Sequence, residues 1–160
     1  MSIPKILKAS TTDLERVKGV LKLGFASDAL IRWVFPDASS YLNSFDKWME
    51  EFSRIAFENN IVYSEENFYG SSLWHPPGIF FDSTVLEPTF ATIPEDRIET
   101  AVRFFEEFEK YHPEDAWYLS FIAVDPINLS ENFLEILVFP IDGPKGLIFF
   151  ILRLNILKVN

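Results

Sequence analysis

The segment from Trp117 to Val124 constrains the fold most, because it is an almost unbroken run of apolar, β-prone residues. It ends at Asp125-Pro126, where proline cannot continue the hydrogen-bond ladder of a sheet. A strand that is apolar on both sides is typical of the centre of a sheet whose two faces are covered. The run therefore predicts a mixed domain built around one central strand.

Upstream of this strand, hydrophobic periodicity and turn residues predict six further elements. They are a strand over 3–9, a helix over 13–25, a helix over 45–56, two strands over 61–63 and 68–74, and a helix between Pro94 and His112. The polar residues 64–67 are expected to form a hairpin turn, and residues 79–93 are expected to be loop. The order is β, α, α, β, β, α, β.

Composition fits one folded domain. The chain has 160 residues and 18.6 kDa, and 48% of its residues are hydrophobic, which excludes full disorder. It carries 14 basic and 24 acidic residues, a net charge of −10, so bulk charge argues against nucleic acid or an anionic membrane as a partner. There is no cysteine, which excludes a disulfide framework, a thiolate nucleophile and a cysteine-ligated metal site.

Neither end of the sequence predicts a membrane segment. Met1 to Lys5 lead into a mixed segment without the apolar core of a secretory signal, so a cytoplasmic location is expected. The most apolar stretch, 146–159, is interrupted by Arg153, Asn155 and Lys158. It is shorter than the roughly 20 apolar residues of a bilayer span, and we expect a buried segment.

Three segments, in this order, resemble the GCN5-related N-acetyltransferase (GNAT) family. Residues 69–78, Y-G-S-S-L-W-H-P-P-G, resemble the end of the family's third strand. His112-Pro113 followed by Trp117-Tyr118-Leu119 resembles the approach to its fourth strand, and 122–126, I-A-V-D-P, resembles the end of that strand. The resemblance covers residues 3–126.

The resemblance implies an α/β (α+β) fold with a mixed, mostly antiparallel sheet flanked by helices. It implies transfer of an acetyl group from acetyl-CoA to the amine of a small molecule or peptide. In such a family the backbone of Ile122, Ala123 and Val124 would pair with the pantetheine arm of the cosubstrate and direct amides at the thioester carbonyl. The family's usual tyrosine acid belongs to a later segment, so no catalytic residue is assigned.

The sequence departs from the family after Pro126. A glycine-containing loop at a helix N-terminus would there cradle the diphosphate of acetyl-CoA. Residues 127–136 read I-N-L-S-E-N-F-L-E-I, with no glycine and with Glu131 and Glu135. We therefore divide the chain into a GNAT-like portion, 1–126, and an atypical apolar tail, 127–160, and expect the fold to be incomplete at its C-terminus.

Residues 146–160 can be encoded by a set of synonymous codons that also has meaning in another reading frame. Read in the frame that starts at the third base of each codon, this sequence encodes x-N-F-F-Y-I-E-T-Q-Y. That segment resembles the family's fifth strand, so we interpret the tail as the product of a frameshift near Pro126. The apolar run 117–124 would then have an unpaired edge, unless residues 147–154 fill the missing strand's position. Three functions stay open: an impaired or inactive acetyltransferase, an unstable remnant, and a non-catalytic interaction module.

Other candidate residues have ordinary structural explanations. His75 and His112 could act as general bases, but each is expected at the surface beside proline, and two such distant histidines do not indicate a metal site. The acidic residues of 65–66 and 106–109 are expected to be solvated. Core packing is the expected role of the aromatic residues that could line an acceptor pocket, Trp33, Phe35, Phe68 and Trp74.

Overall fold

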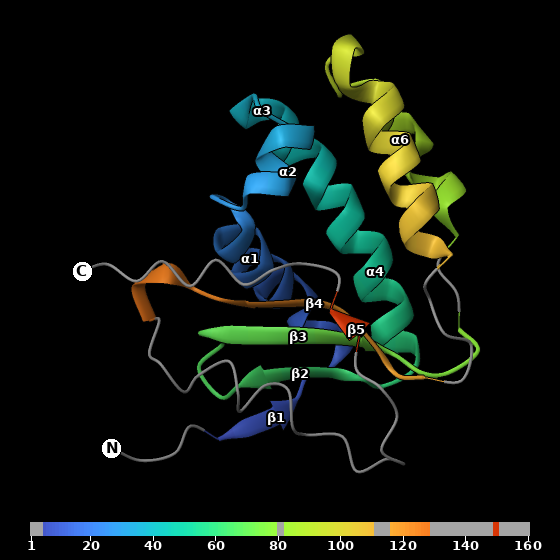
Figure 1. The fold of residues 1–160 in the computed structure, drawn as a ribbon. Helices are drawn as coiled ribbons and strands as arrows, with labels where there is room; N and C mark the ends of the chain where they lie inside the picture. The colour runs from blue at the N-terminus through green and yellow to red at the C-terminus, as the bar shows by residue number, and fades with distance from the viewer. Residues whose placement is uncertain (1–4, 80–81, 111–115, 129–148, 151–160) are drawn as a thin grey trace.

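The computed structural model describes residues 5–79, 82–110, 116–128 and 149–150, which form one sheet with helices packed on it (Figure 1). The strands are β1 (Ile6–Lys8), β2 (Val62–Glu65), β3 (Gly70–His75), β4 (Tyr118–Val124) and β5 (Phe149–Phe150). The longer helices are α1 (Leu14–Phe25), α4 (Asp46–Glu58) and α6 (Glu95–Glu109). The shorter helical segments are η1 (Thr11–Asp13), α2 (Ala29–Val34), α3 (Ala38–Ser40), η2 (Tyr41–Phe45), η3 (Ser83–Leu86), α5 (Glu87–Phe90) and η4 (Pro126–Asn128).

The sheet has the order β1-β2-β3-β4-β5. The first four strands are antiparallel to their neighbours, and β5 is parallel to β4. β4 is buried at every position and lies between β3 and β5. The predicted mixed, mostly antiparallel architecture with a central apolar strand is therefore confirmed.

The position beside β4 is partly filled. Phe149 and Phe150 pair with Tyr118 and Leu119, so at the start of β4 the alternative holds in which residues of 147–154 fill the missing strand's position. The remaining residues of the apolar tail lie outside the described part of the chain, and so does His112.

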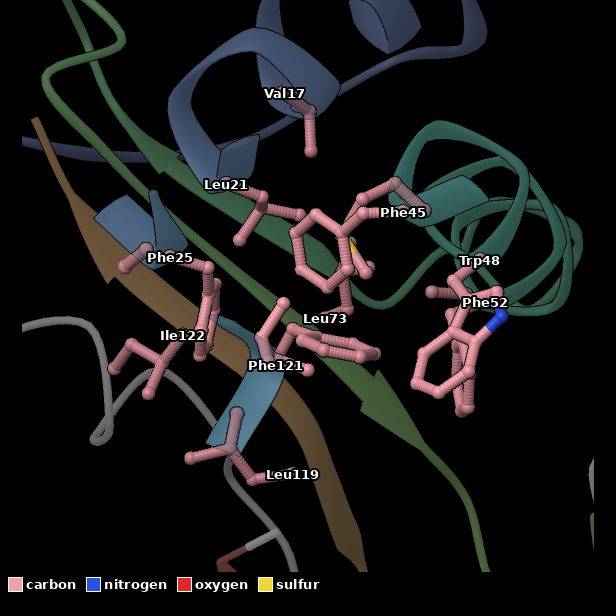
Figure 2. Packing of buried hydrophobic residues seen from close by; sticks show 14 of the residues in the cluster. Val17, Leu21, Phe25, Phe45, Trp48, Phe52, Leu73, Leu119, Phe121 and Ile122 are labelled. Carbon is pink, nitrogen blue, oxygen red and sulfur yellow. The ribbon is translucent and has the colours of Figure 1, made fainter. Parts of the chain in front are cut away.

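α1 and α4 pack against the central strands and lie on the same side of the sheet (Figure 1). Their apolar residues recur at helical spacing, which directs one stripe of each helix at the sheet. Figure 2 shows Val17 and Leu21 of α1 and Phe52 of α4 pointing into one cluster with Leu73 of β3 and Phe121 of β4. The Phe121 ring lies edge-on to the rings of Phe25 at 5.5 Å and Phe52 at 4.9 Å, so β4 closes the core.

α6 packs on α4 rather than on the sheet (Figure 1). The rings of Trp48 and Phe105 meet edge to face at 5.2 Å, and the Trp48 indole donates a 2.8 Å hydrogen bond to Thr89. That bond helps to order part of residues 79–93, which was wrongly expected to be loop throughout. Helical turns η3 and α5 form there, and the Asp82 side chain accepts from the Thr84 amide ahead of them at 3.0 Å.

The β2–β3 hairpin also differs from its prediction. β2 extends through Ser64 and Glu65, and the turn falls two residues later than predicted, at 66–69. The Glu65 carboxylate is only 3% exposed and accepts hydrogen bonds from the amides of Asn67 and Tyr69 at 2.9 and 3.3 Å. Its predicted solvation is therefore wrong, because the turn uses the carboxylate as an internal acceptor, whereas Glu66 is exposed as predicted.

Two lysines of α1 hold the first residue of α4. Lys22 donates to Asp46 at 2.6 Å and the largely buried Lys18 donates to it at 3.3 Å. Burial disfavours the charged carboxylate, but the hydrogen bonds from Lys22 and Lys18 outweigh burial and hold the pKa of Asp46 below its ordinary value. The cluster ties the two sheet-packing helices together by charge.

Because the pKa of Asp46 is lowered by folding, its contribution to stability is fully present above the unfolded pKa near 3.8. The contribution is lost as pH falls through the lower folded pKa. We expect the free energy of unfolding of wild type to drop on acidification more steeply than that of Asp46→Asn, which has no carboxylate to protonate. Urea titrations between pH 7 and pH 3, values chosen to bracket the ordinary pKa, measure the difference. Parallel pH profiles for the two proteins would contradict it.

Gly24 lets α1 approach β4 closely. A Cβ at Gly24 would overlap the Cβ of Ala123 and lie 3.2 Å from the Val124 carbonyl oxygen. Both obstacles are attached directly to the β4 backbone and cannot move aside as a flexible side chain would. A Cβ at Gly19, earlier in the same helix, would meet nothing within 4 Å.

These two glycines form a matched test of that approach. Gly24→Ala should destabilise the protein by about 1–3 kcal/mol through overpacking against β4. Gly19→Ala should stabilise it by roughly 0.5–1 kcal/mol, because alanine is the better helix former and no neighbour obstructs it. Chemical denaturation of both variants measures the two signs. Equal effects would show that α1 does not approach β4 this closely.

Among the described residues, no helix combines the length and the apolar character needed to cross a membrane.

Candidate functional site

A bulge divides β4 into two parts. Leu119 is paired with Trp74 and Phe121 with Leu73, so Ser120 is an extra residue with no partner on β3. A bulge bends its strand and increases the local twist. The two described residues of β5 pair with Tyr118 and Leu119, immediately before this residue. Beyond it, no described strand pairs with Ser120–Val124 on the side away from β3; we call this side the β4 edge.

Polar contacts fix the bulge from inside the protein. The buried Ser120 hydroxyl donates a 3.1 Å hydrogen bond to the Leu73 carbonyl on β3. Its oxygen lies 3.5 Å from Nε2 of His75, whose ring stacks on Phe52 of α4. A bulge disrupts the ladder locally, and a backbone carbonyl left without a partner in the core is costly. Ser120 gives the Leu73 carbonyl a hydrogen-bond donor from its own side chain.

The bulge therefore depends on a serine that sequence patterns did not single out. Removing its hydroxyl by Ser120→Ala should destabilise the fold by about 1–3 kcal/mol, because the buried Leu73 carbonyl loses its donor. Ser53→Ala is the matched control, since Ser53 is equally buried and its hydroxyl has no hydrogen-bond partner among the described residues. Thermal and urea unfolding should show a loss for Ser120→Ala and no loss for Ser53→Ala. Equal losses would mean that the Ser120 bond contributes nothing specific.

Ile122, Ala123 and Val124, the predicted cosubstrate residues, lie in the part of β4 beyond the bulge. Their side chains are 3–4% exposed. Ala123 faces Gly24 of α1, so that side chain belongs to the core. What these residues can offer a ligand is their backbone along the β4 edge.

His75 is fully buried, so its predicted surface position is wrong. Pro76 and Pro77 end the strand as expected, but His75 itself is still paired with Tyr118 of β4. Its ring is enclosed by Phe52 and Tyr118. This burial is a packing role, and it places the imidazole at the bulge rather than at the surface.

The aromatic candidates for an acceptor pocket do not gather at one place. Phe35 and Trp74 are fully buried, which confirms their expected core role. Trp33 is partly exposed beneath the guanidinium of Arg97, and Phe68 lies in the β2–β3 turn beneath that of Arg16. Glu106 and Glu107 on α6 are exposed as expected. In the described part of the chain, no group of three or more potential metal ligands occurs.

Beyond β4 the chain makes a tight turn. The Asp125 amide donates to the Tyr69 carbonyl at 2.7 Å. The Ile127 amide donates to the Asp125 carboxylate at 3.1 Å, and the Asn128 amide donates to the Asp125 carbonyl at 2.8 Å. The strand end is thus held by Asp125 through its own backbone and side chain.

Two solved structures share this architecture. One is described as histone acetyltransferase HPA2 and related acetyltransferase from Corynebacterium glutamicum, with a TM-score of 0.53, 19% identity, and coverage of 86% of this chain and 68% of that one. The other is a mosquito arylalkylamine N-acetyltransferase-like protein 5b, with a TM-score of 0.52, 18% identity, and coverage of 85% and 68%. No family model and no curated protein sequence matches the chain.

At these identities the likeness establishes the fold. The chain has the fold of the GCN5-related N-acetyltransferases, as the three sequence segments predicted.

Proposed function

We propose that the chain is an acetyltransferase-like protein whose β4 edge receives the pantetheine arm of acetyl-CoA. The observation that carries the proposal is the Ser120 bulge, which bends β4 immediately before the residues that would pair with the arm. A pantetheine arm contains two amides and can add to a strand edge as another strand would. The acetyltransferase structures of the same fold support this assignment.

In this proposal the backbone of Ile122, Ala123 and Val124 aligns the arm and directs an amide at the thioester carbonyl. An amide so placed stabilises the charge that develops on the carbonyl oxygen when an amine attacks. The packing of Gly24 on Ala123 and the Ser120 bond to Leu73 keep this backbone rigid. The acceptor is an amine of a small molecule or peptide, and no side chain of the described residues is assigned as base or acid.

We propose that transfer is impaired, because residues 127–136 have no glycine where the family's diphosphate loop would begin. The division at residue 126, the frameshift origin of the tail and the cytoplasmic location stay predictions. The acetyltransferase structures of the same fold favour acetyl transfer over a docking role, so acetyl transfer is the function we advance.

Hydrogen–deuterium exchange tests the binding step. Acetyl-CoA at high concentration should slow exchange in a peptide covering 118–125, because the β4 edge gains a hydrogen-bonding partner. A peptide covering α4, 46–58, is the internal control and should not change. Release of free thiol in the presence of arylalkylamines and of lysine peptides then measures transfer, which we expect to be slow. Unchanged exchange in both peptides would contradict the proposed site.

A further inference from the structure

The turn after β4 offers a ligand no unoccupied backbone N–H group. Across four consecutive residues, the Asp125 amide is bonded to Tyr69, Pro126 has no N–H, and the amides of Ile127 and Asn128 are bonded to Asp125. Diphosphates are held by several backbone N–H groups that point outward together. Here each donor that could point outward is already used within the turn.

Charge at the same place opposes a diphosphate. The Asp125 carboxylate caps the turn, and the Glu65 carboxylate binds the amide of Tyr69, whose carbonyl in turn accepts from Asp125. Tyr69 is thus bonded to two acidic residues, to Glu65 through its carboxylate and to Asp125 through its backbone amide. Of the described cations near the β2–β3 turn, Arg16 has its guanidinium 3.7 Å from the centre of the Phe68 ring, and the carbonyl of Lys5 accepts from the Glu66 amide.

The sequence that follows the turn also lacks the residues that favour binding of a diphosphate. From Gly78 to Gly143 the chain contains no glycine, and Glu131 and Glu135 follow the turn closely. Close approach of a backbone to phosphate oxygens requires positions without a Cβ. The whole chain carries a net charge of −10, so its overall field also repels a polyanion.

We infer that the site selects its acyl donor as a pantetheine thioester and gains nothing from the diphosphate, which the Asp125 carboxylate disfavours. The inference rests on the proposed function, because it assumes that the β4 edge binds the arm. A donor without the nucleotide, such as S-acetylpantetheine, then binds as well as acetyl-CoA.

Calorimetric titration with acetyl-CoA and with S-acetylpantetheine tests whether the diphosphate contributes to binding. We expect their dissociation constants to agree within about threefold, and added salt to strengthen acetyl-CoA binding by screening the repulsion. Acetyl-CoA binding tighter by about tenfold or more, weakened by salt, would overturn the inference and leave the proposed function standing. If neither donor binds, the proposed function fails and the inference fails with it.

A matched pair of single-charge variants tests the role of Asp125. Asp125→Asn keeps an oxygen to accept from the Ile127 amide but removes the charge, so acetyl-CoA affinity should rise several-fold while S-acetylpantetheine affinity stays constant. Glu99→Gln removes one exposed charge on α6, far from the end of β4 (Figure 1), and should alter neither affinity. Equal changes for the two donors in Asp125→Asn, or no change for acetyl-CoA, would contradict the assigned role.

Discussion

The hydrogen bond from Ser120 to the Leu73 carbonyl is the interaction on which the rest of the site depends. β4 must pair with β3 along its whole length to close the core, yet it must also bend at Ser120. An extra residue in β4 satisfies both demands, because it bends the strand without ending the ladder. At this bend the serine hydroxyl donates a hydrogen bond to the Leu73 carbonyl, inside a core where a carbonyl without a partner would be destabilising.

We propose different roles for β4 and for the turn at its end: the strand binds the thioester arm, and the turn disfavours the diphosphate. We propose that the bulge and the close contact of α1 with Ala123 together shape a backbone segment suited to an amide-containing arm. In the Asp125 turn directly beyond it, the backbone N–H groups are already hydrogen-bonded, and the Asp125 side chain adds a carboxylate. In our proposal one strand provides the site for a thioester arm, and the turn at its end disfavours a diphosphate.

Much of this architecture could be predicted from the sequence, because local patterns determine it. The helical spacing of α1 and α4, the apolar run of β4 and the prolines after His75 and Asp125 gave the order of the main elements. The bulge could not be predicted, since it depends on the pairing of Ser120 with residues 47 positions away. His75 was misplaced for the same reason: adjacent prolines indicate a surface, but pairing with β4 and stacking on Phe52 bury it.

A crystal structure of the chain with S-acetylpantetheine would test the central claim most directly. The account predicts an extended ligand lying along Ser120–Val124 as an added strand, with its thioester carbonyl facing a backbone amide of that segment. The bulge at Ser120 should be unchanged in the complex. A ligand bound elsewhere, or a β4 edge already occupied by protein, would contradict the account.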